Sequence, residues 1–155
     1  MSRIYTVEFE NVAVAAAQDF FEITPADDIP CLIHAIFLDQ ISDVGDAEEE
    51  MLRLRLIRGH TTSGSGGTAP TPRPLDARDA AASFAAEVNN TTIASAGAPI
   101  NILSAAFNIR TGYVYMPTPE IRPRVDQGDT TIVLRLMANP ADSVQMSGTI
   151  YIEEL

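Results

Sequence analysis

The sequence contains no lysine and no tryptophan, and all ten of its basic residues are arginine. A chain without lysine forms neither a Schiff base nor the lysine contact of a phosphate-binding loop. The single cysteine, Cys31, rules out an internal disulfide and a cysteine-based zinc cluster. These absences exclude Schiff-base enzymes, lysine-dependent phosphate loops and disulfide-stapled folds.

Long apolar runs and excess positive charge are also missing. No run approaches the ~20 residues that cross a bilayer, and the first ten residues lack the apolar core of a signal peptide. We therefore expect a soluble protein with no membrane partner, made in a reducing compartment. The net charge of −11 repels a polyanion, so we expect no nucleic-acid partner.

The composition that remains is that of a folded domain. The chain has 155 residues, of which 46% are hydrophobic and 20% charged, which is enough to bury a real core. No repeat appears and no linker divides the chain. We therefore expect one domain over residues 1–155.

Period-two alternation predicts β-strands in several segments. In residues 52–56, LRLRL, the leucines share one face and the arginines share the other, which requires an extended chain. Further strands are expected in residues 5–9, 12–24, 112–116, 131–137 and 144–155. Residues 31–39 and 99–110 are more uniformly apolar, which predicts strands covered on both faces.

Turn-forming residues separate these segments, in residues 24–30, 42–50, 126–129 and 139–143. Pro117, Pro119 and Pro123 lack the amide hydrogen of a central strand, so their segment is expected at an edge or in a loop. One short helical turn is expected after Asp76, followed by an extended stretch from Ser83. About eight strands in this arrangement predict an all-β fold, an antiparallel and jelly-roll-like β-sandwich.

The glycine-serine cluster that begins at Gly59 lacks the features of a nucleotide site. A phosphate loop ends in lysine and then serine or threonine at the start of a helix, whereas this cluster leads into prolines. Gly64 and Gly66 have the first spacing of a dinucleotide fingerprint, but Ala69 takes the last position and Pro70 would break the helix that must follow. No serine of the cluster lies in the Gly-x-Ser-x-Gly pattern of hydrolases. We expect no cofactor.

Cys31 and His34 are the one pair that suggests a nucleophile and a base. Their offset of three places them on opposite faces of a strand. Cys31 is therefore expected to be a small buried residue and His34 a half-buried one. No catalytic set remains, and we expect a protein that is not an enzyme.

The acidic stretch of residues 39–50 has the length of a calcium loop. Its Gly45 comes one position too late for the sharp turn of such a loop. Irregular calcium binding by Asp43, Asp46 and Glu48 stays open, while a solvated acidic turn between two strands is the favoured interpretation.

The stretch of residues 59–75 is too long for an ordinary strand connection, and such loops tend to be functional or disordered. Its glycine-serine part is flexible and its proline part is stiff and extended. We expect an arm that contacts a sister subunit or another protein, and a mobile loop without a partner is the alternative. The expected contact residues are Arg58, His60, Pro70, Pro72, Arg73 and Pro74.

Three segments resemble small proteins encoded among the head genes of tailed bacteriophages. They are residues 58–92 (RGHTTSGSGGTAPTPRPLDARDAAASFAAEVNNTT), 106–120 (AFNIRTGYVYMPTPE) and 147–155 (SGTIYIEEL). The likeness extends over nearly the whole chain, from YTVEFENVAV to the end.

The resemblance implies a capsid decoration (cement) protein. Such a protein binds the outer shell of a tailed-phage head and stabilises contacts between capsomers. The implied partners are the major capsid protein and further copies of the chain in a homotrimer. The implied location is the outer capsid surface of the virion, after synthesis in the host cytoplasm. No catalytic residue belongs to this role.

Two alternatives stay open at this point. One is another non-enzymatic virion component, namely a head-fibre base or a tail protein. The other is a carbohydrate-binding β-sandwich module, in which calcium on Asp43 and Asp46 would assist glycan binding.

Overall fold

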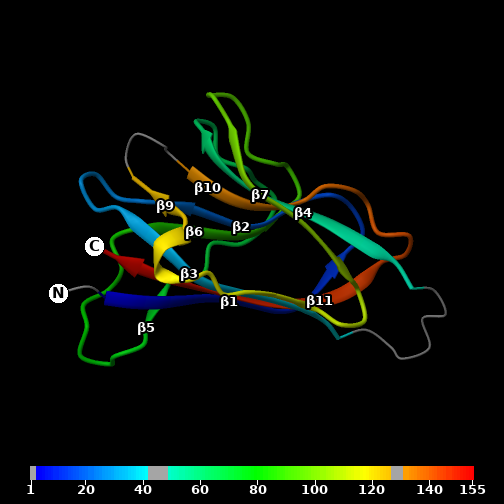
Figure 1. The fold of residues 1–155 in the computed structure, drawn as a ribbon, viewed down its shortest axis with the longest axis horizontal. Helices are drawn as coiled ribbons and strands as arrows, with labels where there is room; N and C mark the ends of the chain where they lie inside the picture. The colour runs from blue at the N-terminus through cyan, green and yellow to red at the C-terminus, as the bar shows by residue number, and fades with distance from the viewer. Residues whose placement is uncertain (1–2, 42–48, 127–130) are drawn as a thin grey trace.

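The computed structural model describes residues 3–41, 49–126 and 131–155 and contains two antiparallel β-sheets packed face to face (Figure 1). Sheet A holds, in spatial order, β5 (Arg73–Pro74), β1 (Arg3–Val14), β11 (Val144–Glu154), β3 (Cys31–Gln40) and β8 (Tyr113–Tyr115), and β9 (Arg124–Val125) also pairs with β3. Sheet B holds β6 (Ala85–Asn90), β2 (Asp19–Thr24), β10 (Thr131–Leu136), β4 (Met51–His60) and β7 (Ile100–Asn108). A 3-10 helix, η1, covers Pro119–Ile121.

The predicted fold class is confirmed as all-β, with two antiparallel sheets in a sandwich. Strands β1 to β4 alternate between the sheets. Strand β10 then inserts between β2 and β4, and β11 inserts between β1 and β3. This connectivity is compatible with a jelly roll. Among the described residues, no helix is long and apolar enough to cross a membrane.

Alternating side chains fill the space between the sheets, as the sequence predicted. Leu52, Leu54 and Leu56 are at most 3% exposed, while Arg53 points to the outer face. Every second residue of β11, from Val144 on, is buried in the same way. Each such aliphatic side chain contributes about 1.5–3 kcal/mol when it leaves water. The core therefore fixes which face of each strand turns inward.

Strand β7 is a correction to the sequence prediction. Residues 99–110 were expected to be covered on both faces because they are uniformly apolar. The structure places β7 at an edge of sheet B, and most of its residues are exposed or half-buried. Ile100 and Ile102 are 52% and 39% exposed. Apolar composition alone does not separate an edge strand from a central one, since position in the sheet decides burial.

A buried carboxylate fastens the connection between β5 and β6. Glu154 accepts hydrogen bonds from the backbone N–H and the hydroxyl of Ser83, both at 2.6 Å, and from the N–H of Phe84 at 3.2 Å. Tyr5 donates its hydroxyl to the carbonyl of Ala80 at 3.1 Å. Where a short helical turn was predicted after Asp76, the structure has a hydrogen-bonded turn that is not a helix, with the N–H of Asp79 bonded to the carbonyl of Asp76.

The Glu154→Ala variant is expected to lose about 2–3 kcal/mol of unfolding free energy, because two backbone donors and a hydroxyl lose a charged acceptor. Urea unfolding measures this loss. The Glu10→Ala variant is the matched control, since Glu10 is exposed on β1. Equal stabilities of the two variants would contradict the role given to Glu154.

Candidate partner-binding surfaces

The glycine-serine stretch lies on its own chain. Residues 61–68, called the strap here, run beside β6 and the 91–98 loop. Thr62 exchanges two backbone hydrogen bonds of 2.9 Å with Ser95, and Ser65 exchanges two of the same length with Thr92. Thr68 is paired with Val88 in the same manner. The strap is thus an irregular extra strand next to β6.

Two glycines explain why this stretch is rich in glycine. A Cβ on Gly64 would lie 2.5 Å from the carbonyl oxygen of Thr92, and one on Gly67 would lie 2.0 Å from that of Val88. Backbone must approach backbone this closely for the strap to pair, and a side chain would prevent it. The glycines therefore allow close packing and do not form a phosphate cradle.

Buried carboxylates hold the strap and the 91–98 loop against the outer face of sheet B. Glu22 is 2% exposed and accepts the N–H of Gly64 at 2.9 Å. Asp19, fully buried, accepts the N–H of Ala94 at 2.8 Å and Nε of Arg135 at 2.6 Å. The buried charge of Asp19 is tolerated because it is paired with Arg135 and hydrogen-bonded.

The predicted contact residues fall into two separate groups. His60 was expected on the long loop, but it is the last residue of β4, 5% exposed, with Nδ1 3.3 Å from the carbonyl oxygen of Ala96. Arg58 lies on the same strand of sheet B. The remaining four lie beside or within β5, at the edge of sheet A, and are half-buried or exposed: Pro70, Pro72, Arg73 and Pro74. Strand pairing thus separates residues that are close in the sequence.

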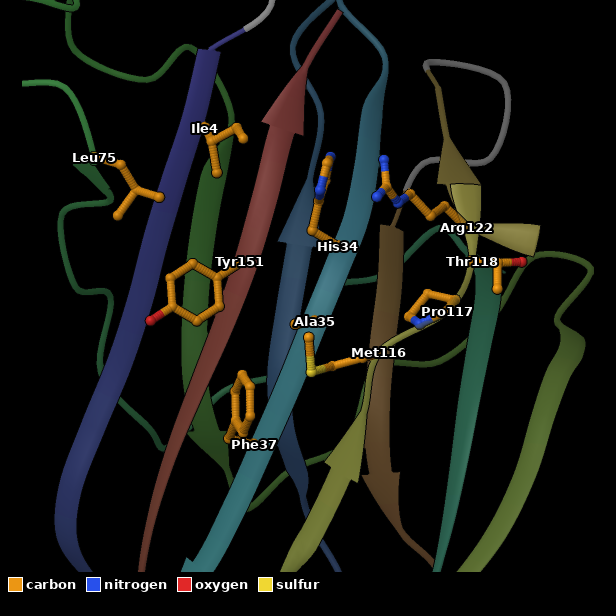
Figure 2. A pocket seen from close by; sticks show the side chains of 10 residues that line it. All are labelled: Ile4, His34, Ala35, Phe37, Leu75, Met116, Pro117, Thr118, Arg122 and Tyr151. Atoms are coloured by element: carbon orange, nitrogen blue, oxygen red, sulfur yellow. The ribbon is translucent and has the colours of Figure 1, made fainter. Parts of the chain in front are cut away.

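A groove of about 610 Å³ lies on the outer face of sheet A (Figure 2). Phe37 on β3 and Tyr151 on β11 form its floor, with ring centroids 6.1 Å apart in an edge-to-face arrangement. Leu75 lies on one side, and Met116 and the residues after it lie on the other. The full lining is Ile4, His34, Ala35, Phe37, Leu75, Met116, Pro117, Thr118, Arg122 and Tyr151.

One end of the groove is polar. Nε2 of His34 and the carboxylate of Glu153 are hydrogen-bonded across β3 and β11. Arg122 extends from the segment after η1 toward His34, and its Nε is buried without a hydrogen-bond partner. Leu75 and Met116 are 58% and 68% exposed at the apolar end. The groove is therefore suited to binding an apolar surface with a polar margin.

Sequence reasoning missed this groove. Its floor comes from outward residues of β3 and β11. The alternation pattern marks Tyr151 as solvent-facing, whereas β3 was predicted to be covered on both faces; the structure corrects this, because Phe37 is only half-buried and lines the open groove. The available signal was the aromatic character of two of those outward residues, Phe37 and Tyr151. Which strands would lie side by side was not readable from the pattern, because β3 and β11 are more than a hundred residues apart in the chain.

The described residues contain no group of three or more His, Cys, Asp or Glu side chains arranged to hold a metal ion. The calcium candidates Asp43, Asp46 and Glu48 lie outside the described residues. The Cys31 side chain is buried in the core and His34 lies on the outer face, as predicted. Comparison with family models, with curated proteins and with solved structures finds no match.

Cys31 is expected to be unreactive toward a thiol reagent such as Ellman's reagent in the native protein at pH 8. Burial, with a smaller contribution from Glu154, raises the pKa of the thiol to about 12, so the nucleophilic thiolate is not populated. The same protein unfolded in urea is the control and should release one equivalent. Prompt reaction of the native protein would contradict the burial of Cys31.

Proposed function

We propose that this protein is a structural virion protein of a tailed bacteriophage, a capsid decoration protein that binds the outer shell of the head. The observation that carries the proposal is the exposed apolar groove on sheet A. The groove is part of the surface of the two-sheet domain. The described residues of this domain form no metal cluster and no cysteine-histidine pair. A surface that binds without reacting is what a cement protein requires.

The groove is the proposed contact with the major capsid protein. Exposed apolar side chains cost free energy in water, and covering them on the shell recovers about 25 cal/mol per Å². Leu75 and Met116 offer such area on its two sides. Phe37 and Tyr151 supply rigid aromatic anchors of the kind that dominate interface energies.

Of the partner-contacting arm predicted over residues 59–75, we retain only the proline-containing part, residues 70–74, as a proposed contact. Residues 61–68 are engaged with their own chain, whereas Thr71 and Arg73 are exposed and, with Pro70, line a small hollow of about 250 Å³ beside Thr6 and Glu8. Because Leu75 follows directly, a shell contact at the groove would extend over this segment. Sister copies are the second proposed partner.

Purified protein is expected to co-sediment with tailed-phage heads that lack it, and the Met116→Glu variant is expected to bind at least about tenfold more weakly. The substitution places a charge at the most exposed apolar side chain of the groove. Ile93→Glu is the matched control, because Ile93 is exposed on the 91–98 loop, over sheet B.

Failure of the unmodified protein to sediment with heads would contradict shell binding. Immunogold label over the tail would place the protein among the other virion components. Binding to a glycan array with no affinity for heads would support the carbohydrate-binding alternative. Equal loss in both variants would show that the groove is not the contact.

A homotrimer is expected in solution, with a mass of about three times 16.7 kDa by light scattering. A trimer allows three shell contacts to act together, which raises the effective affinity without any new type of contact. A monomer at all accessible concentrations would contradict the predicted trimer. The proposal would then reduce to binding of single copies to the shell.

A further inference from the structure

Strand β7 is a long edge that nothing in the described part of the chain covers. It pairs on one side with β4, from Met51 opposite Asn108 to Arg58 opposite Ile100. No described strand pairs with its other side. The ladder is interrupted between Leu56 and Ile57, so the regular part of the edge runs over residues 103–108.

The other sheet edges are protected in ways that β7 is not. The strap pairs with β6 at Val88, and β5 and β8 are only two and three residues long. Strand β1, with which β5 pairs at only two residues, carries Glu8 and Glu10 and an irregularity between Phe9 and Val12. Strand β7 has nine residues, INILSAAFN, with no charge and no proline. Natural proteins place charges, prolines or short strands at exposed edges to prevent unwanted pairing. An edge without these devices is suited to accept a strand.

Two arginines lie beside this edge on the outer face of sheet B. Arg55 stands opposite Ser104 and Arg53 opposite Ala106 in the β4–β7 ladder. No carboxylate among the described residues forms an ion pair with either arginine. Serine and alanine are too small to cover the guanidinium groups. In a chain of net charge −11, two arginines next to the free edge thus have no carboxylate partner among the described residues.

We propose that β7 is a strand-addition site for an extended segment of a partner protein in which acidic side chains alternate with apolar ones. The added strand hydrogen-bonds to the free backbone groups of residues 103–108. Its apolar side chains extend the inward face beside Leu103 and Phe107. Its carboxylates, on the outer face, reach over Ser104 and Ala106 to the arginines, which lie two strands or about 10 Å away.

A second copy of this chain fits the same edge poorly. Pairing β7 with β7 about a two-fold axis would leave Arg53 and Arg55 of each copy three strands, or about 14 Å, from those of the other. Neither β7 carries an acid that could pair with them, so the guanidinium groups of both copies would gain no counter-ion from this contact. An acidic segment instead neutralises both arginines, and the charge pattern therefore selects a partner of opposite sign.

The test uses two capped, fluorescently labelled peptides, Thr-Val-Glu-Val-Glu-Val-Thr and its counterpart with lysine in place of glutamate. Fluorescence anisotropy is expected to show binding of the glutamate peptide, weakening as salt is raised, and no measurable binding of the lysine peptide. The Arg53→Gln/Arg55→Gln double variant is expected to bind the glutamate peptide about tenfold more weakly. The Ser104→Glu variant is expected to abolish binding, because its new carboxylate takes the place of the peptide's carboxylates beside the two arginines.

Arg78→Gln is the matched control for loss of a positive charge, because Arg78 is exposed and paired with Asp76 away from β7. Equal affinity for the two peptides, or equal binding by the double variant and the control, would overturn the proposal. So would a fall in the light-scattering mass of the Ser104→Glu variant, since that would show that a second copy occupies the edge. The assay contains no phage head, so its outcome is separate from that of shell binding.

Discussion

Hydrogen bonds from loop backbone to buried carboxylates are the interaction on which the rest of this structure depends. Asp19, Glu22 and Glu154 are each at most 6% exposed, and they accept N–H groups of Ala94, Gly64 and Phe84 respectively. A hydrogen bond to a charged acceptor contributes about 1.5–3 kcal/mol, and an abandoned buried charge costs more. These three carboxylates of an acidic chain thus hold three successive connections in place, those between β4 and β5, β5 and β6, and β6 and β7.

These hydrogen bonds hold the loops in place and thereby determine which surfaces of the two sheets stay accessible to partners. The strap and the 91–98 loop lie over the outer face of sheet B. They bury a small second cluster there, made of Ala94 with Ile57 of β4 and Val133 of β10. No such loop among the described residues lies over the groove above β3 and β11 on the outer face of sheet A (Figure 2). At the far edge of sheet B, β7 pairs with β4 on one side, and no described strand pairs with its other side (Figure 1). Both proposed contacts lie where the loops do not reach.

Local alternation was enough to predict the inward faces of β1, β4, β10 and β11 and the sandwich class, because burial repeats every two residues along a strand. Strand order was not predictable, since it depends on pairing between distant segments such as β3 and β11. For that reason the predictions that β7 is covered on both faces and that His60 lies on a loop are wrong. The contacts of Glu154 and Glu22 were also not predictable from the sequence, because an acidic residue in a strand usually faces water.

Native-state hydrogen exchange of the backbone amides of Gly64, Phe84 and Ala94, followed by NMR, tests the central claim most directly. If the carboxylates hold these loops, the three amides exchange slowly, at rates close to those of the β10 amides, because they open only with the sandwich. Exchange at the rate of an unstructured loop would contradict the account. The glycine-serine stretch would then be free to leave its own sheet.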